Sequence, residues 1–586
     1  MPFGDAFGVR AVVRACIGLA VLTAIAIGGA RAEVEAPGGV RDVLTAEVLR
    51  HGRQMGDEAV HNGWFMPVGA SAPALHAFTG TLHLPETRMA GFDGGDRGDA
   101  WFPAVALTFI SHDGYLIPVE PGIVGGTGSR SPWDIIVSPG RIWSEADDGG
   151  RSRASFPFVL AGGAWWNEAH NGLATFVFDD DGVSDVRFQI VQETAPYNTF
   201  DGFGRLEATY DPHDVAQAAA VLAAFKMDRA ARLPVRPFAD LESGFSLAAM
   251  RTFAGRYRDE PVSASGLVVD GVIYLRPCET RYGDFPYCEE MRHGVFSVTK
   301  SLGAMVAMLY LAEKHGDHVF DLRIRDYLEV TAHHDGWQDV TFADALNMAT
   351  GIGEGSPNAG SAHYYAEVFP GWKTTLFLDS PSTSGKLRAA FAGLDYDWGP
   401  GEIFRYRNMD TFVLAAAMDS LVKRLEGPEA NMWDNVMAEV LQPIGIPSIP
   451  ISRTVEPDGG TGIPMMAAGL YPNVHDIAKI TSLLHTKGRH DGQQLLSEAK
   501  LDEAFYRTPI RGLDVPGFDE TYHMSLWYFW VRQGPCRVTV PHMSGWGGNI
   551  IEVLPNGLTA FFLSDDFVNE YRAVAEAAGE VRPLCS

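Results

Sequence analysis

The C-terminal half of the chain carries strand-like runs near both of its ends and helical patterns between them. The first two runs lie within Gly266–Leu275 and are joined by Asp270-Gly271, a dipeptide typical of a two-residue hairpin turn. Strand-like runs return only late in the chain, at Trp527–Arg532, Ile550–Leu554 and Leu558–Leu563. This order predicts an α/β domain, in which an antiparallel sheet is flanked by helices and an α-helical subdomain is inserted.

Apolar residues at helical spacing mark the segments that fill this domain. We expect helices at Ser243–Tyr257, from Ser297 through Ala312, at Phe342–Met348 and at Asp410–Leu425.

Residues 33–235 differ in composition, because Gly, Pro and Trp are frequent and the apolar runs are short. Two such runs are Trp101–Ile110 and Ile135–Val137. Gly172–Glu193 alternates like a hairpin across the acidic turn Asp179–Gly182. The region is therefore predicted to be a mostly β N-terminal domain of unknown role.

Two further interpretations of this region are weaker. The three aspartates of the acidic turn suggest a calcium loop, but their spacing and the missing distal Glu favour a plain hairpin turn. Tryptophans could form a carbohydrate-stacking face, although core packing is favoured. They are Trp101, Trp133, Trp143, Trp165 and Trp166.

The length of the chain favours two domains. At 586 residues it exceeds what one hydrophobic core usually organises, and its 46% hydrophobic content is ordinary for a globular protein. Val215–Ala231 has a helical pattern, and Leu233–Pro237 after it resembles a linker. We place the boundary there, with the second domain at 236–586.

The N-terminus resembles a secretory signal peptide of residues 1–32. Arg10 and Arg14 precede an apolar run, Cys16–Ala30, and Ala30-Arg31-Ala32 fits a cleavage site. An uncleaved anchor is the alternative.

The net charge of -27 disfavours nucleic acid and anionic membranes as partners, so we expect a secreted or periplasmic protein without a stable membrane span.

Four cysteines remain after removal of such a signal, and an exported protein would be expected to pair them. We favour Cys278 with Cys288 and Cys536 with Cys585, although other pairings are open. Metal-ligand, phosphate-loop and dinucleotide motifs are missing from the sequence, so we expect no cofactor and no metal.

Ser297 stands three residues before Lys300, a spacing that puts both side chains on one face of a helix. A lysine desolvated in a pocket can take the proton of a serine and make it a nucleophile. The pattern is common, however, and Ser497 and Lys500 repeat it.

A second base or acid is needed for the leaving group. Tyr406 could relay that proton if a nearby cation lowers its pKa, and Asn408 could hold Lys300 and a substrate carbonyl. Tyr471-Pro472-Asn473 is a competing pattern.

A glycine-rich segment, His542–Asn549, precedes a late strand and could bring a backbone N–H to the substrate.

Ser297-x-x-Lys300, Tyr406-x-Asn408 and a His-led glycine strand occur in this order in the serine β-lactamase-related family. The chain resembles that family over roughly 241–566, and the flanks at Val340–Gly351 and Gly469–Lys479 agree as well. Those flanks also assign the Ser497 and Tyr471 patterns to ordinary segments. Members of the family include class C β-lactamases, D-alanyl-D-alanine carboxypeptidases, D-aminopeptidases, carboxylesterases and 6-aminohexanoate-dimer hydrolases.

The resemblance implies a role for each matching residue. Ser297 would be acylated, Lys300 would be its base or the partner of Tyr406, and Tyr406 would serve as base and then as acid to the leaving group. The substrate contacts would come from Asn408, His542, Gly545 and Trp546, with the N–H groups of Ser297 and Gly545 forming an oxyanion hole. Whether Lys300 or Tyr406 takes the first proton is left open.

The third motif departs from the family pattern. We align His542, Met543 and Ser544 with Lys or His, then Thr or Ser, then Gly, so Met543 lacks the hydroxyl that helps hold a substrate carboxylate. This favours a small ester or amide over cell-wall peptides or β-lactams. A binding protein that has kept the fold and lost turnover is the third alternative.

Overall fold

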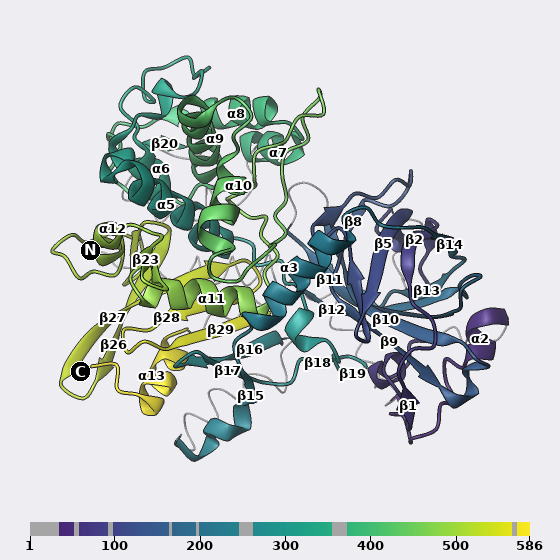
Figure 1. Ribbon diagram of the computed structural model, residues 1–586. Coiled ribbons are helices and arrows are strands. Elements are labelled where there is room, and N and C mark those ends of the chain that lie inside the picture. Colours follow the sequence, from purple (N-terminus) through teal and green to yellow (C-terminus); the bar gives the residue numbers. More distant parts are fainter. Residues whose placement is uncertain are drawn as a thin grey trace, which may run out of the picture. The chain divides into compact units, whose positions relative to one another are not determined.

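The computed structural model describes residues 34–51, 58–91, 98–162, 167–194, 198–244, 246, 262–353, 372–564 and 571–585 (Figure 1). The expected signal peptide, Trp165 and Trp166, and most of the helix expected at 243–257 lie outside these ranges.

One nine-stranded sheet joins the early and late strands of the C-terminal half. Its order is β15-β17-β16-β29-β28-β27-β26-β25-β24, and every pair is antiparallel except β15 with β17. The register of β16 with β29 places Val268 opposite Thr559. The strands are β15 (Val235–Pro237), β16 (Val262–Val269), β17 (Val272–Leu275), β24 (Leu513–Asp514), β25 (Thr521–His523), β26 (Leu526–Gln533), β27 (Cys536–Gly545), β28 (Asn549–Val553) and β29 (Thr559–Ser564).

Helices occupy the sequence between β17 and β24 and follow β29. They are α5 (Val306–His315), α6 (Phe342–Leu346), α7 (Trp372–Asp379), α8 (Thr383–Phe391), α9 (Asn408–Glu426), α10 (Met432–Val436), α11 (Val474–His485), α12 (Glu498–Ala504) and α13 (Tyr571–Val581). Figure 1 shows α6, α8, α9 and α10 grouped together. The expected order of strands, helices and strands is therefore present.

The alternation of side chains along the strands gives this sheet two buried faces. Met543, Ile551 and Phe561 belong to the core shared with α5 and α9. Phe529 and Phe562 point the other way, into the core that α13 covers.

The segment with Ser297 leads directly into a helix. The helical backbone begins at Val298, continues as the π-helical turn η6 (Lys300–Met305) and ends as α5. π-helical turns occur frequently at functional sites, because the extra residue in the turn shifts the side chains around the helix.

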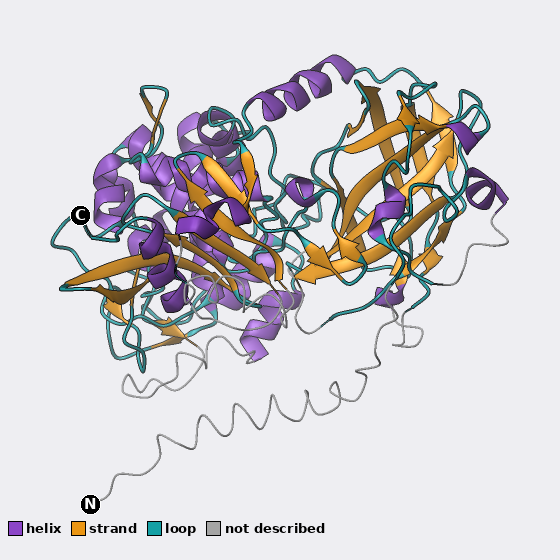
Figure 2. Ribbon diagram, turned by 90° about the horizontal axis from the view of Figure 1, so that it is seen from below, coloured by secondary structure: helices purple, strands orange, loops and turns teal. Residues whose placement is uncertain are grey.

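The N-terminal region is built mainly of strands, as expected. Twelve of them form an antiparallel sheet, with the order β13-β12-β11-β10-β9-β6-β5-β2-β14 along its main path. They are β1 (Ser71–Ala72), β2 (Thr79–Leu84), β5 (Val105–His112), β6 (Tyr115–Pro118), β7 (Ile123–Val124), β8 (Trp133–Val137), β9 (Gly140–Glu145), β10 (Ser152–Gly162), β11 (Ala169–Phe178), β12 (Val186–Thr194), β13 (Phe203–Leu206) and β14 (Thr209–Pro212). Figure 2 shows how strongly strands dominate this region.

Two expectations for this region can be compared with the structure. β11 and β12 form the expected hairpin, and Asp179 Oδ1 accepts hydrogen bonds from the N–H groups of Asp181 and Gly182, as in a turn. Trp133 and Trp143 are buried, which agrees with core packing.

The expected linker is partly a strand. After α3 (Ala218–Ala230), the residues of β15 pair in parallel with β17 at the edge of the nine-stranded sheet. An extended segment containing proline can be accommodated at a sheet edge, where one side of the strand needs no hydrogen-bond partner. The boundary near residue 235 stays a prediction.

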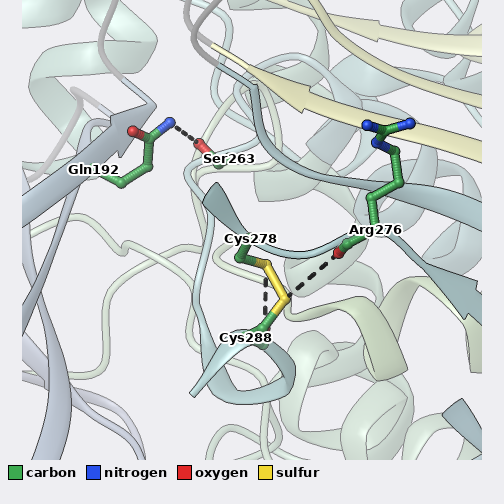
Figure 3. The surroundings of a disulfide bond; sticks show 5 residues. All are labelled: Gln192, Ser263, Arg276, Cys278 and Cys288. Atoms are coloured by element: carbon green, nitrogen blue, oxygen red, sulfur yellow. Dashed lines mark hydrogen bonds between the residues drawn. A yellow bond between two sulfur atoms is a disulfide. The ribbon is translucent and has the colours of Figure 1, made fainter. Parts of the chain in front are cut away.

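Both favoured cysteine pairs are disulfide-bonded, Cys278 with Cys288 and Cys536 with Cys585. Figure 3 shows the first of these beside a hydrogen bond from Gln192 Nε2 of the N-terminal sheet to Ser263 Oγ of β16.

Within the described ranges, no helix combines the length and the apolar character needed to cross a bilayer.

Candidate active site

Ser297 lies at the start of the helix that continues into α5, and its side chain is only partly buried. The preceding residue, Phe296, has a left-handed backbone with φ 47°. A bulky residue adopts this conformation at a cost, and such strain persists only where the surroundings hold it. The turn presents the Ser297 hydroxyl beside the buried face of the helix.

The Lys300 ammonium nitrogen lies in a fully enclosed position, with 1% of the residue exposed. Nζ is 2.9 Å from Ser297 Oγ, 2.8 Å from Asn408 Oδ1 and 2.7 Å from the carbonyl oxygen of Ala467. Desolvation by burial lowers the pKa of Lys300 well below its ordinary value. Lys300 is therefore biased toward the neutral amine.

Tyr406 lies just before α9 and donates a hydrogen bond from its hydroxyl to Ser297 Oγ at 2.6 Å. Its ring stacks on Trp527 of β26, with centroids 5.8 Å apart. Burial raises the pKa of Tyr406. A nearby cation would lower it, but burial disfavours both the phenolate and the charge on Lys300, so the tyrosine is a neutral donor.

Asn408 begins α9, and the residues around it fix its position. Arg407, at the N-cap, forms a buried ion pair with Asp410 in the first turn. Thr350 Oγ1 donates to the other carboxylate oxygen of Asp410 at 3.0 Å. This buried cluster anchors the start of α9 behind Tyr406.

The hydrogen bonds around Ser297 define the proton positions that the site can support. A neutral Lys300 has two N–H donors and one lone pair. Asn408 Oδ1 and the Ala467 carbonyl can only accept, so they take the two donors and leave the lone pair facing Ser297 Oγ. The Ser297 hydroxyl can then donate to Lys300 while accepting from Tyr406, which is the arrangement that base-assisted attack by serine needs.

β27 passes beside this group with Met543 and Gly545 on the same side of the strand. Gly545 packs so closely on Val295 that a Cβ there would overlap the Val295 carbonyl oxygen. Trp546 follows in the turn between β27 and β28 and is 39% exposed. The structure thus brings Gly545 next to the segment that carries Ser297, and Trp546 is the residue that follows it.

His542 is not brought to this site. It lies on the opposite face of the sheet, is 1% exposed and stacks on Tyr571 of α13 with centroids 4.5 Å apart. Because successive strand residues point to opposite faces, Met543 occupies the position facing the α5 core. The substrate contact expected for His542 is therefore withdrawn, and its burial instead lowers its pKa to about 3.

The two competing patterns have structural roles elsewhere. Ser497 caps α12 by accepting a hydrogen bond from the Lys500 N–H, and its hydroxyl donates to Asp317 Oδ1 at 2.8 Å. Asn473 caps α11 by accepting from the Asp476 N–H. Neither pattern surrounds a serine with a buried lysine.

Three groups around Ser297 were not identified from the sequence. They are the carbonyl of Ala467, the left-handed Phe296, and Asn167 of the N-terminal region, whose Oδ1 accepts a hydrogen bond from the Phe296 N–H at 2.6 Å. A backbone carbonyl and a single distant asparagine leave no local pattern in a sequence.

A family model described as Beta-lactamase matches residues 276–581, which is just over half of the chain. The chain belongs to the Beta-lactamase family. It is a serine hydrolase related to the β-lactamases, and the matched residues contain Ser297, Lys300, Tyr406 and β27.

Solved structures of β-lactamase-related proteins are also similar to the chain. A family VIII carboxylesterase is 17% identical, with 57% of this chain and 96% of that chain covered and a TM-score of 0.41. A D-stereospecific amidohydrolase from Streptomyces sp. is 18% identical (57% and 98% covered, TM-score 0.40). A penicillin-binding protein homologue from Caulobacter crescentus is 14% identical (57% and 96% covered, TM-score 0.40).

At these scores the structural similarities do not bear on the substrate. No curated protein matched the chain.

Proposed function

We propose that this β-lactamase-related chain is an exported serine hydrolase that cleaves a small ester or amide through an acyl-enzyme on Ser297. The observation that carries the proposal is the contact of Ser297 Oγ with both Lys300 Nζ, at 2.9 Å, and Tyr406 OH, at 2.6 Å. A nucleophile with a desolvated base and a separate proton donor satisfies the needs of acyl transfer.

Lys300 takes the proton of Ser297 as Oγ bonds to the substrate carbonyl carbon. The N–H groups of Ser297 and Gly545 stabilise the oxyanion. When the bond to the leaving group breaks, Tyr406 passes a proton to the departing oxygen or nitrogen and recovers one from Lys300. Water then attacks the acyl-enzyme, its proton moves to the same bases, and the acid product leaves with Ser297 restored.

The residue types of the third motif favour a substrate without a carboxylate next to the scissile bond. Met543 occupies the position of β27 that faces the α5 core, and it is apolar and buried. A peptidase or β-lactamase that holds a substrate carboxylate there needs a cation or hydroxyl. The exposed Trp546 instead offers an apolar surface for an acyl or alcohol group.

Export is supported by the pair of disulfides, since such bonds persist in oxidising compartments. The complete set of Ser297, Lys300 and Tyr406 supports turnover rather than binding alone.

The test is a comparison of substrates on the purified protein. We expect hydrolysis of p-nitrophenyl acetate or butyrate that is lost in Ser297→Ala, with little turnover of penicillin or of a D-Ala-D-Ala peptide. Preferred turnover of either cell-wall compound would overturn the substrate class and support the peptidase or β-lactamase alternative. Folded protein without any Ser297-dependent turnover would support a binding protein.

A further inference from the structure

The peptide unit between Val295 and Phe296 lies one residue before Ser297 and is held on both of its polar groups. On one side, the Val295 carbonyl oxygen accepts a hydrogen bond from the Val298 N–H at 3.2 Å, and Gly545 of β27 packs closely on it. On the other side, the Phe296 N–H donates to Asn167 Oδ1 at 2.6 Å. The next peptide unit carries the Ser297 N–H, so the orientation of this one sets the direction of the proposed oxyanion donor.

Asn167 is well placed to hold that orientation. It is 1% exposed and precedes β11 in the N-terminal sheet. Its amide nitrogen donates to the carbonyl oxygen of Leu470 at 3.2 Å, which fixes the rotation of the side chain. Leu470 also accepts from the Val295 N–H, so the asparagine joins two neighbouring segments of the hydrolase domain.

A second contact from the same end of the N-terminal sheet supports the first. Thr194, the last residue of β12, accepts a hydrogen bond from the Gly294 N–H at 3.0 Å. Gly294 permits this approach, because a Cβ there would overlap the backbone carbonyl of Asn167. The backbone before Ser297 is thus contacted at Gly294 and Phe296 by side chains from outside the family-matched residues.

We propose that the N-terminal β region completes the active site and that Asn167 is a positioning residue for the nucleophile. The inference rests on the proposed function, in which Ser297 is acylated. Without the Asn167 acceptor, the buried Phe296 N–H has no partner, and the left-handed Phe296 loses the contact that holds it. The peptide would rotate toward a commoner conformation and carry the Ser297 N–H and Oγ away from their working geometry.

Another hydrogen bond joins the N-terminal sheet to the segment before Ser297 without involving the Val295–Phe296 peptide. Asn171 Nδ2 donates to the Arg292 carbonyl at 3.0 Å, and Asn171 is as buried as Asn167. Replacement of Asn171 removes one interdomain hydrogen bond several residues before Ser297. Asn171→Ala is therefore the matched control, because it shows the effect of losing a buried hydrogen bond between the two regions without disturbing the peptide before Ser297.

The experiment measures the rate constant of labelling by a fluorophosphonate, kcat and KM for p-nitrophenyl acetate, and thermal unfolding. The full-length proteins compared are the wild type, Asn167→Ala, Asn167→Asp and Asn171→Ala. The amplitude of labelling reports the folded fraction, whereas the rate reports the geometry of the folded site.

We expect Asn167→Ala to slow labelling and lower kcat by about tenfold or more, because small misplacements of a nucleophile are costly. KM should stay within about threefold, since Asn167 does not touch substrate. Asn167→Asp keeps an oxygen acceptor and should react faster than Asn167→Ala. Asn171→Ala should be labelled at a rate within about twofold of wild type, even if its unfolding temperature falls as far as that of Asn167→Ala.

Wild-type labelling rates in Asn167→Ala, or equal losses in Asn167→Ala and Asn171→Ala, would overturn the inference. If Asn167→Ala yields no folded protein, Thr194→Val is the second variant, because it removes the acceptor of the Gly294 N–H while nearly keeping the shape of the side chain. Slowed labelling of Thr194→Val would support the inference, and an unchanged rate would overturn it. A wild-type protein that is not labelled at all would overturn the proposed function itself.

Discussion

Lys300 is a lysine whose surroundings disfavour its charge, and this makes the reaction sensitive to pH. Burial lowers its pKa, and only the neutral amine can accept the proton of Ser297. As pH falls through the lowered pKa, Nζ becomes protonated and its lone pair is lost. We therefore expect kcat/KM to fall on the acid side and to reach a plateau above that pKa.

Replacement of this lysine tests the assignment. Lys300→Met keeps the length of the side chain without a base, and kcat/KM should drop by about 10²–10⁴ with loss of the acid limb. The measurement is a pH–rate profile on a p-nitrophenyl ester. A variant that retains both the rate and the acid limb would assign the base to another group.

The residues of the proposed site differ in how easily a sequence reveals them. Ser297 and Lys300 are three apart, and Tyr406 and Asn408 lie at the start of one helix, so local spacing reveals them. His542 was misassigned because a shift of one residue along a strand reverses the face to which a side chain points. Asn167 could not be found, since it approaches Ser297 only through the packing of two sheets.

At the scale of elements, the second Ser-x-x-Lys pattern is a helix cap. Ser497 accepts from the Lys500 N–H, and Lys500 pairs with Glu503 within α12. Ser497→Ala should lower the free energy of unfolding by about 0.5–2 kcal/mol, the usual cost of losing a cap. Esterase activity at saturating substrate should be unchanged, and denaturant unfolding with steady-state kinetics measures both. Loss of activity with unchanged stability would contradict this role.

Local sequence patterns predicted most helices and strands, but they did not predict where an element ends or which strands pair with each other. α9 begins at Asn408, two residues before the expected start, because the Arg407–Asp410 ion pair stabilises its first turn. β15 was expected as a linker, since three residues pairing at a sheet edge resemble a loop in sequence. The pairing of β16 with β29 joins segments far apart in the chain, so no local pattern reveals its register.

At the scale of the whole molecule, a buried ion pair connects the N-terminal sheet to the hydrolase domain. Arg281 contacts the carboxylate of Glu193, which is 1% exposed in its side chain. Arg281→Leu would leave that carboxylate buried without its cation, and should cost about 3–5 kcal/mol in the first unfolding transition.

The control is the half-buried pair of Arg205 with Asp185, which water still reaches, so Arg205→Leu should cost less, about 1 kcal/mol or below. Urea unfolding followed by tryptophan fluorescence measures both variants. Equal small effects would show that the Arg281 contact does not stabilise the protein.

The composition and length of the chain allowed a β region and an α/β region to be predicted. They could not show that the two meet beside Ser297, because the contacts of Asn167 and Thr194 depend on tertiary packing. With or without that contact, the proposed reaction requires Ser297 to be the nucleophile.

Mass spectrometry of the protein after treatment with a fluorophosphonate tests this role of Ser297 most directly. The account predicts a single adduct on the peptide that contains Ser297, absent in folded Ser297→Ala and present in Ser497→Ala. An adduct on another residue, or an undiminished adduct in Ser297→Ala, would contradict it.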